Sequence, residues 1–378
     1  NNYEITSEKD ALLLDISADS TQQKLYATYK IQYSSSSNHL FVNQYKIAGA
    51  LEKTFDFTGQ AEKKNFNSAQ YIPQSEGNGI IAGTYGFNVT NTRRQYDYYD
   101  NYYNSYYYNY YSPYYYSRQS SYDANEDKTP VSDGYFTAVV KSGVAGKIKY
   151  FNFSGFSNAY KYITDPSALR LKNKATRKKE KSATEEQAEE TFDNEKTLNL
   201  RLITHDIMIN NGQFIITSEA YSPEYHTNTQ MSYDYYGRAF PTSYQVFDGF
   251  RYSHAFIAGF DSSGNMLWYN GMEMRDILTK YLNRKLNFVF DKDEIVLFYN
   301  ANNKVASKVI KGNTIVDNTS YTSLVPLRNT DQPIDEYLGT IEHWYSDYFI
   351  ASGYQTIRNN YLESNKRNVF YISKMAFR

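Results

Sequence analysis

The sequence predicts an all-β fold, and three features of the chain support this prediction. Short segments in which apolar and polar residues alternate recur along the 378 residues, as expected of half-buried strands. Turn-forming dipeptides such as Asn-Gly separate several of these segments. A strand–turn–strand unit also occurs twice, and no apolar run approaches the roughly 18 residues that a membrane-spanning helix needs.

The clearer copy of the repeated unit is residues 252–270, YSHAFIAGFDSSGNMLWYN. Strands are predicted at 254–260 and 266–269, and the turn between them ends in Gly264, because glycine adopts a positive φ without strain. The other copy is residues 134–153, GYFTAVVKSGVAGKIKYFNF. In the alignment of the two copies, Phe136 matches Phe256, Ala138 matches Ala258, Gly146 matches Gly264, and 150–152 match 268–270. Such a repeat indicates an architecture of similar sheets.

Five units of strand-like segments follow one another along the chain. Each unit has a central strand that ends in tyrosine, and these strands are 25–29, 81–85, 215–221, 295–299 and 350–354. The strands that precede them are 11–16, 66–72, 198–209, 286–290 and 340–344. The third strands are 39–47, 135–141, 254–260, 304–310 and 368–375. A fourth strand follows in the first four units, at 51–57, 147–153, 266–269 and 313–319.

Consecutive four-stranded antiparallel units predict a β-propeller, because each sheet then covers the face of its neighbour and no long edge stays open. The fifth unit lacks a fourth strand, and residues 2–6 have the alternation to supply it. We therefore expect one β-propeller domain over residues 1–378, with five or six blades, closed by the N-terminal strand. A β-sandwich with a second β domain is the alternative.

Three long insertions interrupt this scheme. Residues 90–132 and 222–251, both rich in tyrosine, fall between the second and third strands of the second and third units. Residues 156–197, which are charged, connect these two units. In an up-and-down blade both kinds of connection emerge on the same face of the disc. We expect the three insertions to share one face, and loops on a rigid scaffold are where binding residues concentrate.

Tyrosine dominates this predicted face. The chain has 42 tyrosines, and a dense run of them extends from Tyr96 to Tyr116. A tyrosine side chain offers a large apolar ring, few rotatable bonds and a hydroxyl that donates and accepts, which suits protein contacts and sugar stacking. The predicted partner-binding residues are Tyr96, Tyr98, Tyr99, Tyr102, Tyr103, Tyr106, Tyr107, Tyr108, Tyr110, Tyr111, Tyr114, Tyr115, Tyr116, Tyr233, Tyr235 and Tyr236. A low-complexity loop without a partner is the alternative.

The charged insertion and the overall charge argue against nucleic acid as a partner. Basic residues 170–181 precede acidic residues 185–190, an order that would oppose the macrodipole of a helix, so a flexible, solvated segment is expected. The net charge of −1 gives no general attraction to nucleic acid or to an anionic membrane. The tyrosine runs also lack interleaved basic residues.

The sequence carries no catalytic signature. The absence of cysteine excludes disulfides, thiolate zinc sites and cysteine nucleophiles. The five histidines show neither the HxH nor the HExxH spacing, so we predict no metal and no cofactor. Two of them, His205 and His343, adjoin carboxylates in first strands, which would line the channel of a propeller.

An enzymatic alternative would use carboxylates in that channel. Asp15, Asp206 and Glu342 all fall in first strands, and paired carboxylates catalyse glycoside hydrolysis. Their flanking residues do not match the motifs of five-bladed glycosidases. The segment 261–268 is similar to the Asp-box of sialidase-type propellers, but it has an extra residue before Gly264 and lacks the leading Ser or Thr. We therefore predict a non-enzymatic protein.

The segments FTAVVKSGVAGKIKYFNF and FIAGFDSSGNMLWYN, led by strands such as IIAGTY and FIITSEAY, resemble exported β-propeller proteins of Bacteroidetes-type bacteria. That group includes the plug subunit of the type IX secretion translocon, and the likeness covers most of the chain outside the insertions. It implies a periplasmic or outer-membrane-associated protein that docks on an outer-membrane protein complex and plugs a secretion channel. The start at Asn1 is consistent with a removed signal peptide. A carbohydrate-binding propeller at the cell surface is the alternative function.

Overall fold

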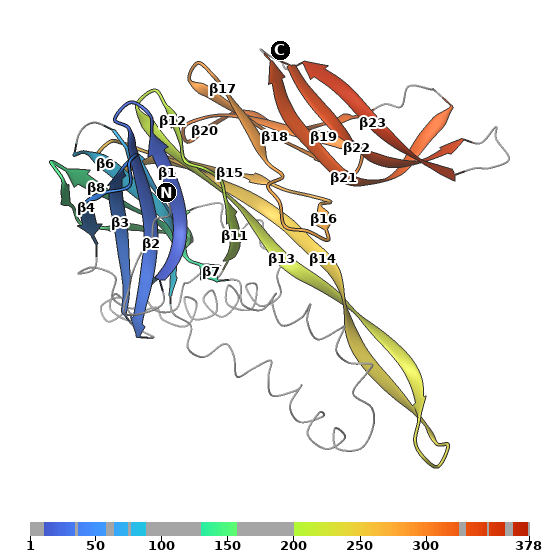
Figure 1. Cartoon of the computed structure of the whole chain (residues 1–378). Coiled ribbons are helices and arrows are strands. Elements are labelled where there is room, and N and C mark those ends of the chain that lie inside the picture. The colour runs from blue at the N-terminus through green and yellow to red at the C-terminus, as the bar shows by residue number, and fades with distance from the viewer. Residues whose placement is uncertain are drawn as a thin grey trace, which may run out of the picture. The chain divides into compact units, whose positions relative to one another are not determined.

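The computed structural model of the chain describes residues 11–34, 37–57, 64–74, 77–87, 130–156, 200–324, 330–345, 348–359 and 366–376. The fold is all-β, as predicted, and its strands form several antiparallel sheets (Figure 1). No helix among these residues is long and apolar enough to cross a membrane. Residues 2–6, predicted to close the ring, lie outside the described residues.

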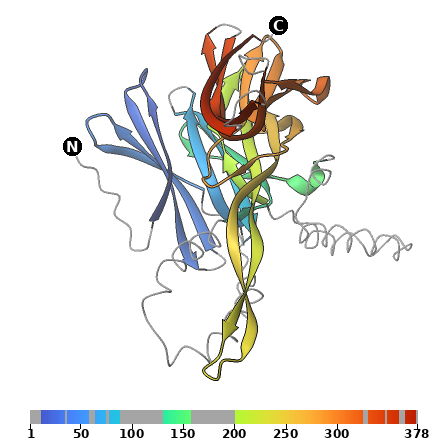
Figure 2. The ribbon, with the colours of Figure 1, turned by 90° about the vertical axis from the view of Figure 1, so that its right-hand side faces the viewer.

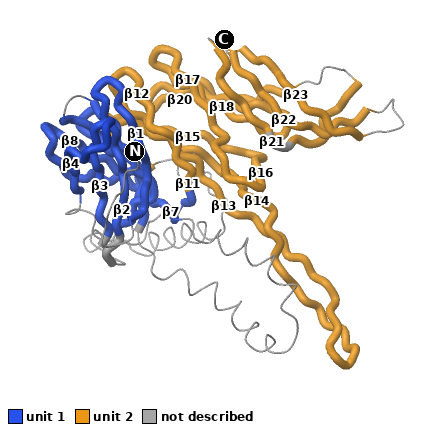
Figure 3. The backbone as a smooth tube through the Cα atoms, viewed as in Figure 1, with its two compact units in different colours: residues 1–155, 197–201, 262–265 blue, residues 156–196, 202–261, 266–378 orange. Residues whose placement is uncertain are grey.

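The chain divides into two compact units (Figure 3). The first unit contains Asn1–Gly155, Thr197–Arg201 and Ser262–Asn265. The second unit contains Phe156–Lys196, Leu202–Asp261 and Met266–Arg378. Each unit has its own hydrophobic core, and the two are described separately below.

The first unit contains two sheets. One sheet has the order β1-β2-β3-β4, formed by β1 (Ala11–Asp19), β2 (Lys24–Ser34), β3 (Ser37–Lys46) and β4 (Leu51–Asp56). The other has the order β10-β8-β6-β5, formed by β5 (Lys64–Pro73), β6 (Gly79–Phe87), β8 (Gly134–Lys141) and β10 (Lys149–Asn152), and β9 (Val144–Ala145) pairs with β8. The short strand β7 (Val131–Ser132) pairs with the first residues of β11 (Leu200–Thr204).

The core of the first unit lies where these two sheets meet face to face. Tyr71, which is buried, contacts the ring of Tyr26 at 4.9 Å between centroids and that of Phe55 at 5.8 Å. Phe66 and Phe136, also buried, meet edge to face at 4.8 Å. Aromatic pairs of this kind add stabilisation beyond the area that they bury. Alternation along each strand therefore places one row of side chains against the neighbouring sheet.

The second unit contains three sheets. In the first of these, β13 (Gln213–Tyr233) and β14 (Ala239–Phe260) are flanked by β11 and β15 (Met266–Glu273), while β12 (Met208–Asn210) and β16 (Leu278–Thr279) pair with β13 and β14. The next has the order β17-β18-β19-β20, formed by β17 (Asn287–Asp291), β18 (Glu294–Ala301), β19 (Lys304–Lys311) and β20 (Thr314–Ser323). The last consists of β21 (Asp331–Tyr345), β22 (Tyr348–Asn359) and β23 (Lys366–Ala376).

Strand β18 separates two hydrophobic clusters of the second unit. Ile295, Leu297 and Tyr299 face the cluster shared with β13, β14 and β15. Val296 and Phe298 face the cluster shared with β21 and β22. A strand covered on both faces has a continuous apolar sequence rather than an alternating one, and this explains the run Ile-Val-Leu-Phe-Tyr in this segment.

The tyrosine that ends each predicted central strand has a consistent environment in the first four sheets. Tyr29, Tyr85, Tyr221 and Tyr299 are all buried, whereas Tyr354 in the fifth sheet is exposed. Along β22, buried and less buried residues alternate strictly. Only one face of the fifth sheet is therefore covered among the described residues.

The repeated strand–turn–strand unit forms an antiparallel pair in both places, but the predicted match of Gly146 with Gly264 is wrong. In the first copy the chain turns at Ser142 and Gly143, which have φ values of 49° and 74°. Gly146 lies beyond that turn, and its N–H donates to the Val139 carbonyl at 2.8 Å. In the second copy Gly264 itself takes the positive φ, 72°. After its tight turn, the first copy pairs with β8 as β9 and again as β10, with residues 146–148 between them, so the register of the two copies differs.

Candidate protein-interaction arm

The predicted insertion 222–251 does not form an irregular loop, because it continues β13 and β14 as a two-stranded ribbon (Figures 1 and 2). We call residues 222–251 the arm. Its pairing runs from Ser222 opposite Arg251 to Tyr233 opposite Ala239. With a rise of about 3.3 Å per residue, this ribbon is about 40 Å long.

The turn at the tip of the arm is organised by one carboxylate. Asp234 Oδ1 accepts the N–H groups of Tyr236 at 2.9 Å and of Arg238 at 2.8 Å. Asp234 Oδ2 accepts Arg238 Nε at 2.7 Å, and these hydrogen bonds lower the pKa of the carboxyl group. Gly237 has a φ of 75°, which glycine adopts without a steric penalty. This side-chain-to-backbone bonding is the reason that Asp is favoured in turns.

Polar cross-strand pairs hold the register of the outer arm, by which we mean residues 228–244. Thr229 and Ser243 are hydrogen-bonded through their hydroxyls at 2.9 Å, and Thr242 donates to Ser232 at 2.9 Å. Asn228 Nδ2 donates to Tyr244 Oη at 3.0 Å. Such pairs each contribute about 0.2–1 kcal/mol to a ribbon. The outer arm is therefore held by pairing between its own strands rather than by burial.

At its base the arm is anchored to the core by a column of aromatic rings. Tyr221 belongs to the buried cluster and meets Phe250 edge to face at 5.6 Å. Phe250 contacts Phe247 at 5.0 Å, and Phe247 contacts Tyr225 at 5.5 Å. Strand β16 pairs with Phe250 and Arg251 and supports the same region.

A bidentate ion pair also crosses the base. Arg251 donates to both carboxylate oxygens of Glu224, and these hydrogen bonds lower the pKa of Glu224. Both side chains are about two-fifths exposed. An ion pair this accessible contributes little to stability, so the aromatic column is the stronger tie.

The outer arm exposes aromatic side chains in a nearly uncharged setting. The exposed fractions of Tyr233, Tyr235 and Tyr236 are 70%, 93% and 79%. Between positions 225 and 247 the only Asp, Glu, Lys or Arg residues are Asp234 and Arg238, which pair with each other. Met231, Phe240 and Tyr244 are exposed as well. Met231 was not identified from the sequence, where an isolated Met among polar residues gives no signal.

The edges of the outer arm are open among the described residues. There, the outer arm pairs between its own two strands, and β16 reaches no farther than Phe250. A two-stranded ribbon by itself is marginally stable in water. Unpaired strand edges also present backbone donors and acceptors to other chains.

Of the predicted partner-binding residues, the structure describes Tyr233, Tyr235 and Tyr236, and it places them together at the tip. The rings of Tyr235 and Tyr236 meet edge to face at 5.5 Å. The other thirteen, from Tyr96 to Tyr116, lie outside the described residues, as does all of the charged insertion 156–197 except Phe156. A shared face for the three insertions stays a prediction.

Of the carboxylates considered for catalysis, Asp206 has a structural partner. Asp206 forms an ion pair with Arg284 at 2.8 Å, and that hydrogen bond lowers the pKa of Asp206. Its neighbour His205 contacts the buried Glu219, with 2.6 Å between Nε2 and Oε1. Glu342 is exposed on β21. Within the described ranges, no group of three His, Asp or Glu side chains has a metal-binding arrangement.

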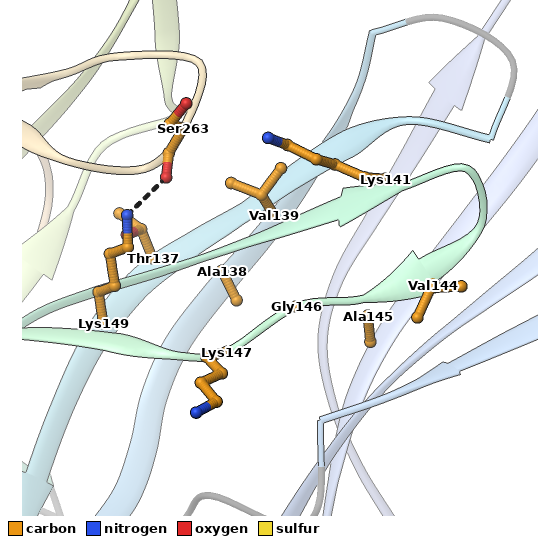
Figure 4. Close-up of a pocket in the computed structure, with 10 residues that line it drawn as sticks. All are labelled: Thr137, Ala138, Val139, Lys141, Val144, Ala145, Gly146, Lys147, Lys149 and Ser263. Atoms are coloured by element: carbon orange, nitrogen blue, oxygen red, sulfur yellow. Dashed lines mark hydrogen bonds between the residues drawn. The ribbon is translucent and has the colours of Figure 1, made fainter.

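A shallow cavity of about 390 Å³ lies in the first unit beside β8 (Figure 4). Lys149 lines it and donates to the Ser263 carbonyl at 2.8 Å and to Asn265 Oδ1 at 2.6 Å. Thr137 Oγ1 donates to the Gly264 carbonyl at 2.7 Å. These bonds fasten the turn 262–265 to β8 and β10, so Lys149 and Thr137 serve the fold.

Comparison with known proteins gives only distant likenesses. No family model and no curated protein sequence matches the chain. The polysaccharide lyase Uly1 has a TM-score of 0.32 and 10% identity, over 96% of this chain and 57% of the lyase. A candidate hydrolase from Bacteroides ovatus ATCC 8483 has a TM-score of 0.25 and 10% identity, over 94% of this chain and 76% of the hydrolase. The chain thus spans little more than half of the lyase, and neither likeness indicates a function.

Proposed function

We propose that this chain is a non-enzymatic interaction module that binds a protein partner through the outer arm. The observation that supports this proposal is the exposure of Tyr233, Tyr235 and Tyr236 at the tip of the arm, where the charges of Asp234 and Arg238 pair with each other. Tyrosine is enriched among the residues that dominate binding energy at protein interfaces. A contiguous exposed aromatic surface of this kind is typical of interaction sites.

The construction of the arm favours a protein as the partner. Its open edges offer backbone groups to an added strand, which is a common mode of peptide recognition. The base is anchored by the aromatic column, so the inner ribbon is ordered before binding and adds little entropic cost to association. Because the charges of the tip are paired with each other, we expect binding to depend weakly on salt.

The partner that we propose is an outer-membrane protein complex, in which the chain plugs a protein-secretion channel as an exported protein. This choice rests on the sequence resemblance described above. We also propose that the sheets form one five-bladed propeller, with residues 2–6 as the fourth strand of the last blade. The succession of antiparallel sheets along the chain supports this arrangement. The first insertion, with Tyr96 to Tyr116, would add its tyrosines to the same binding face.

Purification of the tagged full-length protein from native membranes tests the proposal. We expect a triple Ser substitution at Tyr233, Tyr235 and Tyr236 to lose the co-purifying partner while circular dichroism stays unchanged. The matched control is Tyr281→Ser, because Tyr281 is 71% exposed but lies outside the arm. A partner that the triple variant retains in full would contradict the proposal.

Sugar binding is the alternative that the same exposed rings support, because sugars stack on tyrosine. Stacking depends on one or two fixed rings, whereas protein docking distributes contact over many side chains. A glycan panel therefore separates the two functions. Binding of one glycan class that Tyr235→Ser alone abolishes would favour the carbohydrate-binding protein.

A further inference from the structure

Three aromatic rings surround one ammonium group where β21 meets β22. Lys374 Nζ lies 3.7 Å from the ring centroid of Tyr348, 5.4 Å from that of Trp344 and 5.5 Å from that of Tyr345. The rings of Trp344 and Tyr345 are 4.6 Å apart at 70°, and those of Tyr345 and Tyr348 are 5.1 Å apart at 46°. We call these three rings the aromatic cage.

Strand register brings these residues together. Tyr345 pairs with Tyr348 at the end of the hairpin, and Trp344 precedes Tyr345 on β21. Lys374 on β23 pairs with Ile350, two residues beyond Tyr348, so both side chains stand on the same face of the sheet. The lysine side chain extends along that face to the cage, where Nζ also contacts Tyr345 Oη at 3.3 Å.

The arrangement is more than an incidental contact between a lysine and a ring. A cation within about 6 Å of a ring centroid is attracted by the ring quadrupole, and clusters of such rings recognise quaternary ammonium groups. Elsewhere among the described residues of the second unit, Lys280 and Arg238 each lie over a single ring, those of Phe247 and Tyr236. Trp344 and Tyr345 are exposed, so the cage is open to solvent.

We propose that the aromatic cage is a binding site for small quaternary-ammonium compounds and that Lys374 occupies it in the unliganded protein. A lysine ammonium is strongly hydrated and has three donors to satisfy. A quaternary ammonium has no N–H group and sheds its water more readily, so the cage favours it over the ammonium that it holds. The site lies on the fifth sheet and does not depend on the function of the arm.

Lys374 then acts as an internal competitor. The apparent dissociation constant of a ligand equals its intrinsic value divided by the fraction of molecules in which the cage is empty, so it rises as Lys374 fills the cage. Removal of the lysine side chain should therefore strengthen binding rather than weaken it. If Lys374 did not compete with the ligand for the cage, removal of its side chain would not increase the affinity for the ligand.

Choline titration of the purified full-length protein tests the proposal through tryptophan fluorescence. The chain has two tryptophans, and Trp268 is buried with its Nε1 donating to Gln213 Oε1 at 2.8 Å, so Trp344 reports on the cage. We expect Lys374→Ala to bind choline about fivefold to tenfold more tightly than the wild type. Lys280→Ala is the matched control, and its affinity should equal that of the wild type.

Two comparisons decide whether the cage recognises charge. In the Lys374→Ala background, Tyr348→Leu should abolish choline binding although the side chain remains apolar. Tyr345→Leu serves if that variant does not fold, because it leaves the Trp344 reporter in place. The neutral isostere 3,3-dimethylbutan-1-ol should not bind. Equal binding of the isostere, or no choline binding by Lys374→Ala, would overturn the site. Unchanged affinity in Lys374→Ala would overturn its occupation by Lys374.

Discussion

Replacement of Glu219 by Ala should destabilise the second unit more than the loss of any surface ion pair. Glu219 is fully buried on β13, and its Oε1 lies 2.6 Å from His205 Nε2. Its carboxylate also accepts the backbone N–H groups of Lys285, at 2.9 and 3.0 Å, and of Leu286, at 3.0 Å. This one side chain therefore accepts hydrogen bonds from both backbone N–H groups that directly precede β17.

The expected loss follows from the groups that Ala would leave without an acceptor. Two backbone N–H groups and one imidazole nitrogen lose their partner, and each unsatisfied buried group costs about 1–3 kcal/mol. The sum is roughly 3–9 kcal/mol, a large part of the ~5–15 kcal/mol that stabilises a domain. Glu219→Gln keeps one acceptor oxygen, so its loss should be intermediate.

Urea unfolding followed by tryptophan fluorescence measures this effect in the right part of the molecule, because Trp268 and Trp344 both belong to the second unit. The control is Glu224→Ala, which removes the exposed ion pair with Arg251 and should cost less than about 1 kcal/mol. Equal losses in Glu219→Ala and Glu224→Ala would refute the reasoning, since they would mean that the buried groups find other acceptors.

Two further predictions concern the arm and the response to acid. Asp234→Ala removes the acceptor of the Tyr236 and Arg238 amides, so hydrogen exchange at these amides should accelerate several-fold while global unfolding is unchanged; unchanged exchange would mean that Asp234 does not hold the turn. His254 is buried, and burial lowers its pKa from 6.5 to about 3. Between these pH values the unfolded chain therefore binds more protons than the folded chain. The free energy of unfolding should fall as the pH falls from 6.5 towards 3, by up to about 1.4 kcal/mol per pH unit. His254→Phe should flatten that part of a pH series of urea unfolding, and an unaltered slope would assign the acid sensitivity to other groups.

The sequence was sufficient to predict strands that are buried on one or both faces. Residues 215–221 and 295–299 read as strands because burial selects apolar side chains, and their patterns survive in the sequence. The segment predicted as one strand at 198–209 is interrupted, because β11 ends at Thr204 and β12 begins at Met208. Periodicity indicates where strands lie, but it does not reveal short breaks within them.

The arm was identified as a segment but not as a ribbon, and the physical reason is its lack of a buried face. With both faces exposed, Thr, Gln, Ser and Tyr alternate without an apolar period, so the pattern resembles that of a loop. Its order comes from cross-strand bonds such as Thr229 to Ser243, whose partners are far apart in sequence. The aromatic cage was also missed, because strand pairing brings Lys374 close to rings that lie about 30 residues earlier in the sequence.

The arm combines a base that packs against the core with a tip whose described hydrogen bonds lie within the arm itself. At the base, Phe250 joins the core cluster through Tyr221 and pairs with β16. At the tip, the bonds of Asp234 close the loop, and the surrounding rings are exposed to water. Local stability should therefore decrease from base to tip, so that the residues proposed to bind a partner are the ones that a partner stabilises most. A bound partner raises the free energy of opening by RT ln(1 + [L]/Kd), about 2.7 kcal/mol at a hundredfold excess over Kd, and that gain would be concentrated in the outer ribbon.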